Sequence, residues 1–512
     1  MIARFSGRPG RTRVVVALLA LVLAPSDARA QVSGSNLLVG QGGNVAFQDP
    51  TDRTGLYDQL NLELPFGGGR VGVRFETDQN STNSFIYHTI TQRFAEWSDE
   101  RVRVRVGNVY TLLGRGLVHR SFEVPGVVLD QPGIQSRYGF TRDLDGALIE
   151  GTLGPVGARL VSGQPNGGDT SPGIDPDGTL RYRGQTTGGE ASVRLPRDAR
   201  VGATFTRFTN TGADQQALGS GFLEADPLGI AGVQSVALPL YFEYAQQDGD
   251  LGDWVRFRTG SGVPHALYSS ANLLWRQVAF SAEWKDYRSF RFGTNDPPSL
   301  VREHGWALLN RATHVLDADG ERGFQIEGSW SLPALGALVL NLSRSDSPAG
   351  RRFDERFAEL RIAPPGRPWE GTVFLDGGED RFAFVQDRST AGLGVSVRLP
   401  VTWAASAEFE QQRTRRDPDR FTDRRASLTA SRAEWGSASL LWERSTDPAQ
   451  WDPARPGQAR RFIAGVVSAR LSERHEATLF WGERRGGRAC TAGTCYEVAS
   501  FKGMELRMTS RF

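Results

Sequence analysis

The sequence predicts an all-β fold, a single transmembrane antiparallel up-and-down β-barrel of about 22–24 strands with short turns at one rim and long loops at the other. Three observations support this prediction: an N-terminal leader, pairs of alternating strands along the rest of the chain, and a final strand that ends on an aromatic residue. Apolar residues make up 39% of the 512 residues, which is low for a chain of this length that buries one compact core. The composition suits a wide barrel, because only alternate residues of each strand face lipid.

The N-terminus has the three parts of a secretory signal. Four arginines precede an apolar run at 14–24, and Ala28-Arg29-Ala30 places small residues at the positions that a signal peptidase reads. We therefore expect residues 1–30 to be cleaved and residues 31–512 to form the barrel. Cleavage removes five Arg and one Asp, so the net charge changes from +2 to 2 − 4 = −2. A nearly neutral mature chain argues against nucleic acid as a partner.

Strand pairs with short turns follow one another through the mature chain. In the clearest pair, apolar residues alternate with polar ones over 60–64 and over 70–76, on either side of a turn. Hairpin turns are predicted at 65–69, 98–100, 154–155, 196–198, 238–239, 276–277, 333–336, 364–368, 400, 434–436 and 472–474. With an opening strand at 37–47 and a closing strand at 496–512, these hairpins give about 24 strands. A propeller would show a blade repeat, which the sequence lacks.

The long connections are rich in Gly, Pro, Asp and Asn, and we expect them to face the outside. They are predicted at 163–173, 210–229, 247–264, 293–323 and 445–458. If the tight turns are periplasmic, both ends of the mature chain lie at the periplasmic rim and these loops are extracellular. Acidic pairs such as Asp317 and Asp319 resemble fragments of calcium loops but lack a third acid and the closing Glu. We interpret these acidic pairs as solvated turns. Calcium bound between two loops is the alternative, and no metal site is predicted.

Three arginines alternate with valines at 101–106. Arg101, Arg103 and Arg105 should face the lumen, because arginines that face hydrocarbon cost several kcal/mol in total. Stacked on one inner wall, they would form a positive strip, and lumen charge sets the solute preference of a wide pore. The alternative is that they pair with lumen carboxylates such as Glu63, Glu76 or Glu150 and only fill the wall.

The following run, 107–130, is too apolar for an exposed loop and too rich in Gly for a strand. Gly114 and Gly116 allow the backbone to fold sharply, so we expect 114–130 to bend inward and narrow the pore. Arg115, Arg120 and Asp130 are then the candidate residues for contact with a solute.

The last strand alternates clearly to its end. Phe512, Ser510, Met508, Leu506 and Met504 form one mostly apolar face, and polar or charged residues alternate with them. This pattern resembles the C-terminal signature of bacterial outer-membrane β-barrels, although a hydroxyl residue is unusual at the position of Ser510. The resemblance implies an outer-membrane location in contact with lipid. It also implies that the barrel-assembly machinery reads Phe512, Met508 and Leu506.

A second resemblance rests on Gly107-Asn-x-Tyr110 and Gly114-Arg-Gly-Leu117. This arrangement is similar to one in a family of bacterial outer-membrane barrels that has no assigned activity, so it implies the fold and no function. Gly114 and Gly116 do not form a nucleotide-binding loop, because the further glycines and the strand-to-helix context are absent.

Few other residues of the sequence suggest a chemical role. Cys490 and Cys495, in an exported chain, are expected to form a disulfide that pins one hairpin loop. The histidines stand singly, without the nucleophile and acid that acyl transfer needs, so neither an enzyme nor a cofactor is expected. The six are His88, His119, His265, His304, His314 and His475.

We therefore expect a porin-like channel for small polar solutes. The alternative is an occluded barrel that serves as a scaffold or docking partner for a periplasmic or surface protein complex. The sequence identifies neither the solute nor the partner.

Overall fold

The computed structural model describes most of the mature chain. The described residues are 32–45, 53–81, 86–124, 129–131, 134–136, 141–166, 184–210, 216–233, 235–248, 257, 262–290, 296–317, 320–451, 455–491 and 494–512. Residues 1–31 lie outside them, and so does the predicted cleavage site. No helix of the described residues is long and apolar enough to cross a membrane.

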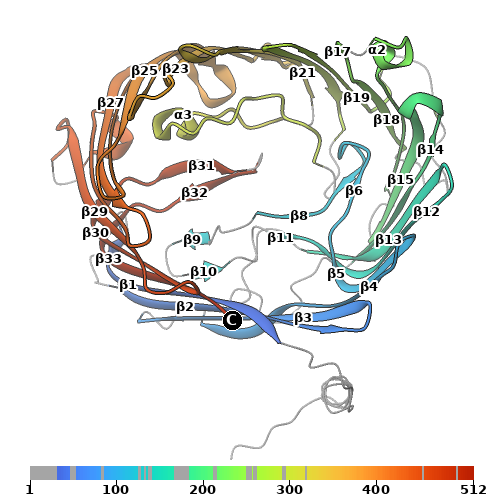
Figure 1. Ribbon diagram of the computed structural model, residues 1–512, viewed down its shortest axis with the longest axis horizontal. Helices are drawn as coiled ribbons and strands as arrows, with labels where there is room; N and C mark the ends of the chain where they lie inside the picture. The colour runs from blue at the N-terminus through green and yellow to red at the C-terminus, as the bar shows by residue number, and fades with distance from the viewer. Residues whose placement is uncertain are drawn as a thin grey trace, which may run out of the picture.

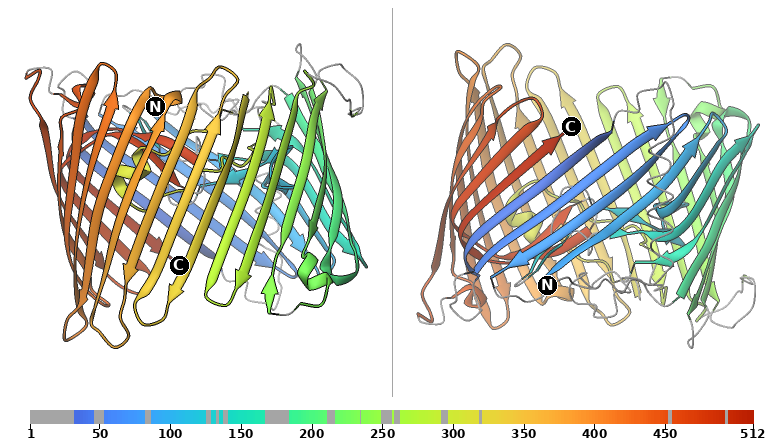
Figure 2. Two further views of the ribbon diagram at one scale, coloured as in Figure 1. Left: turned by 90° about the horizontal axis from the view of Figure 1, so that it is seen from above. Right: turned by 90° about the horizontal axis from the view of Figure 1, so that it is seen from below.

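The wall is a closed antiparallel barrel of 24 strands, in which β17 and β18 are two parts of one strand (Figure 1). The wall strands are β1 (Ser33–Val45), β2 (Arg53–Phe66), β3 (Gly69–Asn80), β4 (Tyr87–Ser98), β5 (Val102–Val109), β12 (Leu144–Leu153), β13 (Val156–Pro165), β14 (Gly184–Arg194), β15 (Arg200–Asn210), β16 (Gln216–Ala225), β17 (Val236–Ala237), β18 (Leu240–Asp248), β19 (His265–Trp275), β20 (Val278–Arg288), β21 (Gly320–Leu332), β22 (Gly336–Asp346), β23 (Arg352–Ile362), β24 (Trp369–Asp380), β25 (Val385–Arg398), β26 (Trp403–Arg416), β27 (Asp419–Arg432), β28 (Gly436–Ser445), β29 (Arg460–Arg470), β30 (His475–Arg484) and β33 (Phe501–Arg511). The predicted fold class is confirmed. Figure 2 shows the strands inclined to the barrel axis, as closure of a barrel requires.

Short elements lie in the connections between the wall strands along the chain. They are β6 (Leu112–Leu113), β7 (His119–Arg120), β8 (Phe122–Glu123), β9 (Leu129–Gln131), β10 (Ile134–Ser136), β11 (Thr141–Arg142), β31 (Gly487–Thr491), β32 (Thr494–Val498), α2 (Pro227–Ile230), α3 (Ala307–Arg311) and the single turns η2 (Pro196–Asp198), η3 (Arg381–Ala383) and η4 (Pro448–Gln450). Figure 1 shows β6, β8, α3 and the β31–β32 hairpin inside the ring of wall strands.

The barrel closes between its first and last strands. The Gly34 N–H donates to the Phe512 carbonyl at 2.8 Å, and the Phe512 N–H donates to the Gly34 carbonyl at 3.1 Å. The start of β1 and the end of β33 therefore lie at one rim of the barrel, here called the chain-end rim. Because neighbouring strands are antiparallel, the short turns at 67–68 and 154–155 also lie there, and the longer connections lie at the opposite rim, here called the loop rim.

The alternation of residue types matches the two faces of the wall. In β33, Met504 and Leu506 are exposed on the outside, whereas Glu505 between them is buried on the inside. Glu505 there accepts a hydrogen bond from Gln41 of β1 at 2.9 Å and pairs with Arg484 of β30 at 3.0 Å. Apolar side chains face outward and paired polar ones face inward, as in a barrel surrounded by lipid.

Three details of the sequence interpretation are wrong. The predicted loop at 210–229 contains β16, which pairs with β15 and β18. The predicted turn at 238–239 interrupts one wall strand between β17 and β18, and the chain instead reverses around α2. The closing strand begins at Phe501, since Tyr496 belongs to β32. Pro239 lacks the N–H that a continuous ladder needs, so it breaks a strand without turning the chain.

Candidate functional site: the segments inside the lumen

The first segment inside the wall, here called the inner turn, comprises residues 110–124. The Gly114 N–H donates to Glu190 of β14 at 3.0 Å, and the Arg115 N–H donates to Glu243 of β18 at 2.8 Å. Gly114 has φ of 56°, and a Cβ there would lie 2.4 Å from a Glu243 carboxylate oxygen. Only glycine allows both this backbone conformation and this close approach.

Glu243 is the main anchor of the inner turn on the wall. It is fully buried, and besides the Arg115 N–H it accepts the Ser220 and Tyr241 hydroxyl groups, each at 2.7 Å. A buried carboxylate with three donors is well satisfied, whereas the loss of donors would leave a costly buried charge. The inner turn is therefore part of the folded wall.

The apolar side of the inner turn packs on the wall. Leu117 and Val118 are completely buried in a cluster with side chains from β16, β18, β19 and β20. Burying each such side chain contributes about 2 kcal/mol to the free energy of folding. The other members of the cluster are Leu218, Phe222, Tyr241, Ala245, Ala266, Tyr268, Tyr287, Phe290 and Leu300.

The predicted solute-contacting residues have different surroundings. The Arg115 side chain is exposed, and its guanidinium carbon lies 4.8 Å from the centre of the Tyr241 ring. Arg120 pairs with Asp296 at 2.5 Å and lies over Phe122. Asp130 belongs to β9, and its side chain lies outside the described residues.

Two of the three arginines at 101–105 have carboxylate partners on the inner wall. Arg103 bridges Glu96 at 2.7 Å and Glu150 at 2.9 Å, and Arg105 pairs with Glu96 at 3.2 Å. Arg101 is exposed at the turn before β5. Of the carboxylates considered in the sequence, Glu150 is the one bound to these arginines. Glu63 pairs with Arg70, and Glu76 accepts a hydrogen bond from Thr91.

A second segment, here called the inner helix segment, comprises residues 296–317. The prediction that 293–323 faces the outside is wrong for these residues, because their polar groups bind inward-facing carboxylates. The N–H groups of Ala307 and Leu308 donate to Glu410 of β26 at 3.2 and 2.8 Å. The other contacts are Trp306 to Glu359 at 2.9 Å, His304 to Glu355 at 3.2 Å and Arg311 to Glu443 at 2.6 Å.

His314 holds the C-terminal end of the inner helix segment. Its two ring nitrogens lie 3.1 Å from Asp380 and 3.2 Å from Glu321, which also pairs with Lys285 at 2.6 Å. Burial by itself lowers the pKa of His314, but the hydrogen bonds to the two carboxylates outweigh it and raise this pKa. The ring also stacks on Phe353 with 4.5 Å between centres.

The third segment is the β31–β32 hairpin, here called the disulfide hairpin, which contains the Cys490–Cys495 disulfide. Asn310 of α3 joins it to the inner helix segment. The Asn310 amide donates to the Cys490 carbonyl and accepts from the Cys490 N–H, each at 2.9 Å. The two segments therefore form one connected unit inside the barrel.

The residues that sequence reasoning missed are the wall carboxylates that bind the inner segments, such as Glu190, Glu243 and Glu410. They lie within alternating strands, as in Phe242-Glu243-Tyr244 and Glu408-Phe409-Glu410. Their inward direction follows from this alternation, but their partners come from distant segments, so the sequence offers no signal for the pairing. Among the described residues, no group of three or more His, Cys, Asp or Glu could hold a metal ion.

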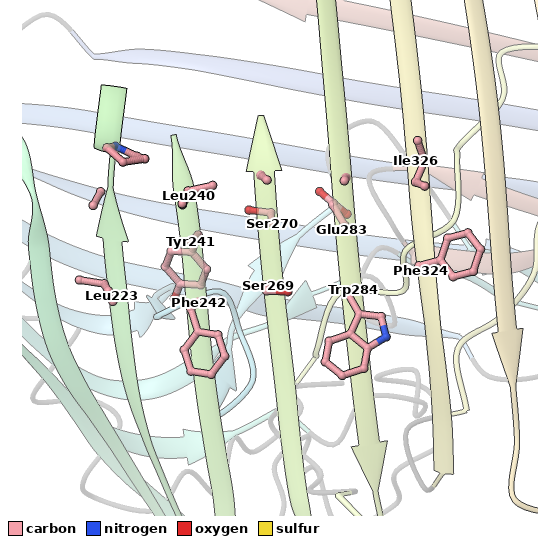
Figure 3. Close-up of a pocket in the computed structure, with 14 residues that line it drawn as sticks. Leu223, Leu240, Tyr241, Phe242, Ser269, Ser270, Glu283, Trp284, Phe324 and Ile326 are labelled. Carbon is pink, nitrogen blue, oxygen red and sulfur yellow. The ribbon is translucent and has the colours of Figure 1, made fainter. Parts of the chain in front are cut away.

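The wall also has a hollow on its outer face, with a volume of about 540 Å³ (Figure 3). In the strand register, Ser269 lies between Phe242 and Trp284, and Ala271 lies between Leu240 and Ala282. Small side chains on β19 and β20 thus leave space between larger apolar ones. Because these residues alternate with inward-facing ones such as Glu243, the hollow lies outside the barrel and not in the lumen.

No family model matches the sequence, and no curated protein matches it. Solved structures resemble the fold, among them the E. coli P pilus tip assembly intermediate PapC-PapD-PapK-PapG, with a TM-score of 0.53 and 13% identity over 96% of this chain and 62% of that chain. The P pilus usher (PapC) translocation pore gives a TM-score of 0.48 and 12% identity over 94% of this chain and 99% of that one. The outer membrane protein opdK from Pseudomonas aeruginosa gives a TM-score of 0.36 and 11% identity over 80% of this chain and 99% of that one. At 13% identity, the likeness to the tip assembly intermediate shows the barrel fold alone.

Proposed function

We propose that this chain is a porin-like outer-membrane channel for small polar solutes. The observation that carries the proposal is a closed wall with an apolar outer face and a polar, charged inner face. The inner turn, the inner helix segment and the disulfide hairpin narrow the lumen. Nothing in this role requires catalysis or a cofactor.

Within this proposal, Arg115 is the principal solute contact. Its backbone is anchored on Glu243, while its guanidinium group is exposed over Tyr241. A fixed backbone with an exposed cation can attract the negative or polar end of a solute without moving. Arg103, Arg105 and Arg120 have carboxylate partners and contribute less free charge to the lumen. Arg101 and Asp130 remain candidates from the sequence.

The barrel would lie in the outer membrane after removal of residues 1–30, with the chain-end rim in the periplasm. The assembly machinery would read Phe512, Met508 and Leu506. If the mature chain remained in the aqueous fraction after cell breakage without detergent, this location would be contradicted.

A planar-bilayer recording of the purified protein tests the channel. We expect a steady open current, because the polar inner face holds water and ions. The competing function is an occluded scaffold for a periplasmic or surface complex. A silent barrel that conducts only after deletion of residues 114–130 would favour the scaffold over the channel. The mobility of unboiled samples in an SDS gel shows whether the deletion variant is folded.

A further inference from the structure

The outer face of four neighbouring strands changes from apolar to basic at one level. Residues that lie side by side in the register of β26 to β29 form two adjacent rows, the second closer to the loop rim. The first row consists of Phe409, Ala426, Trp442 and Ile463. The second row consists of Gln411, Arg424, Arg444 and Arg461. We call Arg424, Arg444 and Arg461 the arginine row.

The arginine row faces outward. Glu410 and Glu443 point into the lumen, where they bind α3 and Arg311. Successive side chains of a strand point to opposite faces, so Arg424, which pairs in the register with Arg444, shares the outer face with it. Arg461 alternates with Phe462, which is buried on the inside, and is itself exposed.

Three arginines directly opposite one another repel. Facing residues on neighbouring antiparallel strands have Cβ atoms about 5 Å apart, and like charges at this distance are destabilising. Among the described residues, no carboxylate lies within ion-pair distance of any member of the arginine row. Within the described part of the chain, the one hydrogen bond of these side chains runs from Arg424 Nε to Gln411 at 2.8 Å, and glutamine brings no charge.

Three outer arginines elsewhere on the wall differ in this respect. Arg288, Arg344 and Arg356 each pair with an aspartate two residues away in the same strand, at 3.1, 3.2 and 3.2 Å respectively. The chain thus supplies an acid for each of these three arginines. Among the described residues from β27 to β29, no acid pairs with the arginine row, so a negative charge from outside the chain would relieve the repulsion.

We propose that the arginine row binds the phosphate groups of a lipid in the leaflet at the loop rim. The row lies directly beside the apolar row of Trp442 and Ile463, which is where the hydrocarbon of a bilayer ends and the headgroups begin. A guanidinium group binds a phosphate through two parallel hydrogen bonds, and neighbouring arginines can share one phosphate. The apolar row would hold the acyl chains of the same lipid. The proposal rests on membrane insertion and not on channel activity.

Native mass spectrometry of the full chain in a non-ionic detergent tests the site. The probes are dioctanoyl phosphatidic acid, dioctanoyl phosphatidylcholine and inorganic phosphate. Each arginine near a charged lipid contributes about 1 kcal/mol of binding free energy. Loss of all three arginines therefore lowers the affinity for the lipid roughly 100-fold. We therefore expect the R424Q/R444Q/R461Q variant to bind phosphatidic acid about 100-fold more weakly than the wild type, with phosphatidylcholine bound weakly by both.

The matched control is R356Q, which removes an outer arginine that has its own aspartate, and it should bind the lipid as the wild type does. Unboiled gel mobility and bilayer conductance should not change in either variant, which separates this site from the channel. Equal binding of phosphatidic acid by wild type and triple variant would overturn the proposal. Inorganic phosphate that binds as tightly as the lipid would overturn the assignment to a lipid.

Discussion

At the scale of single residues, the charged side chains that face the lumen are of two kinds, those paired with a partner and those exposed. Most arginines of the inner face that contact the wall carry a carboxylate partner, as Arg103 does with Glu96 and Glu150. Such pairs fill the wall and leave little net field in the lumen. Arg115 differs because its backbone, and not its guanidinium group, is bound to the wall carboxylate. Exposed charge at a narrow point has the largest effect on permeating ions.

Replacing Arg115 by Glu should make the channel more cation-selective. A unit charge acting over about 10 Å in water contributes about 0.4 kcal/mol. Reversal of the charge therefore lowers the energy of a cation and raises that of an anion by about 0.8 kcal/mol each, which is about 15-fold in the cation-to-anion permeability ratio. The reversal potential in a salt gradient measures this ratio. Arg115→Lys keeps the charge and should behave like the wild type. A wild-type reversal potential in Arg115→Glu would place Arg115 away from the ion path.

His119 should make the inner turn sensitive to acid. Its ring is completely buried, and this burial lowers its pKa from 6.5 to about 4. The unfolded turn therefore takes up a proton before the folded turn does, so stability is full above pH 6.5 and is lost as the pH falls towards 4. The loss amounts to about 3 kcal/mol. Limited proteolysis within 110–124 at pH 7.5 and pH 4.5 should show this loss in the wild type, and His119→Phe should remove the difference.

At the scale of elements, the wall strands were largely predictable and the inner segments were not. The alternation of apolar and polar residues depends on local sequence, so it revealed ten of the eleven hairpin turns where the structure has them. β16 was missed because Gly219 and Gly221 weaken its pattern and resemble loop residues. The inner helix segment was assigned to the outside because its polar composition is typical of a loop. Its place depends on carboxylates such as Glu410, about 100 residues away in the chain.

Glu410 should decide how firmly α3 is held on the wall. The Glu410→Ala substitution removes the acceptor of the Ala307 and Leu308 N–H groups, and hydrogen bonds to a charged group contribute about 2 kcal/mol. Amide hydrogen exchange at Ala307 and Leu308 should therefore become about 30-fold faster. Glu408 faces the lumen two residues away in the same strand and contacts Arg425 and Ser427, so Glu408→Ala is the control. Equal exchange in both variants would show that packing, and not Glu410, holds the helix.

At the scale of the whole molecule, a wide barrel has no central core, so its integrity depends on every strand being paired. The inner segments give part of the wall a packed inner layer through buried residues such as Leu117 and Leu309. The seam between β1 and β33 is different, because it joins residues from the two ends of the chain. Closure of this seam converts the sheet into a barrel without edges, which a bilayer requires.

Gly34 should be essential for this closure, and Gly40 should not. A Cβ at Gly34 would lie 2.5 Å from the Asn61 carbonyl oxygen and 2.7 Å from the Phe512 ring, so a valine there would displace the neighbouring backbone and the last residue. Gly40 lies in the same strand, and nothing is within 4 Å of the position of its Cβ. We expect Gly34→Val to reduce the ratio of folded to unfolded protein, measured in unboiled SDS gels after incubation in urea, by about tenfold or more, because an overpacked contact costs about 1–3 kcal/mol. Gly40→Val should fold as the wild type does, since a further apolar side chain on β1 meets no atom of the protein. If both variants folded equally well, the contact between Gly34 and Phe512 would not be what closes the barrel.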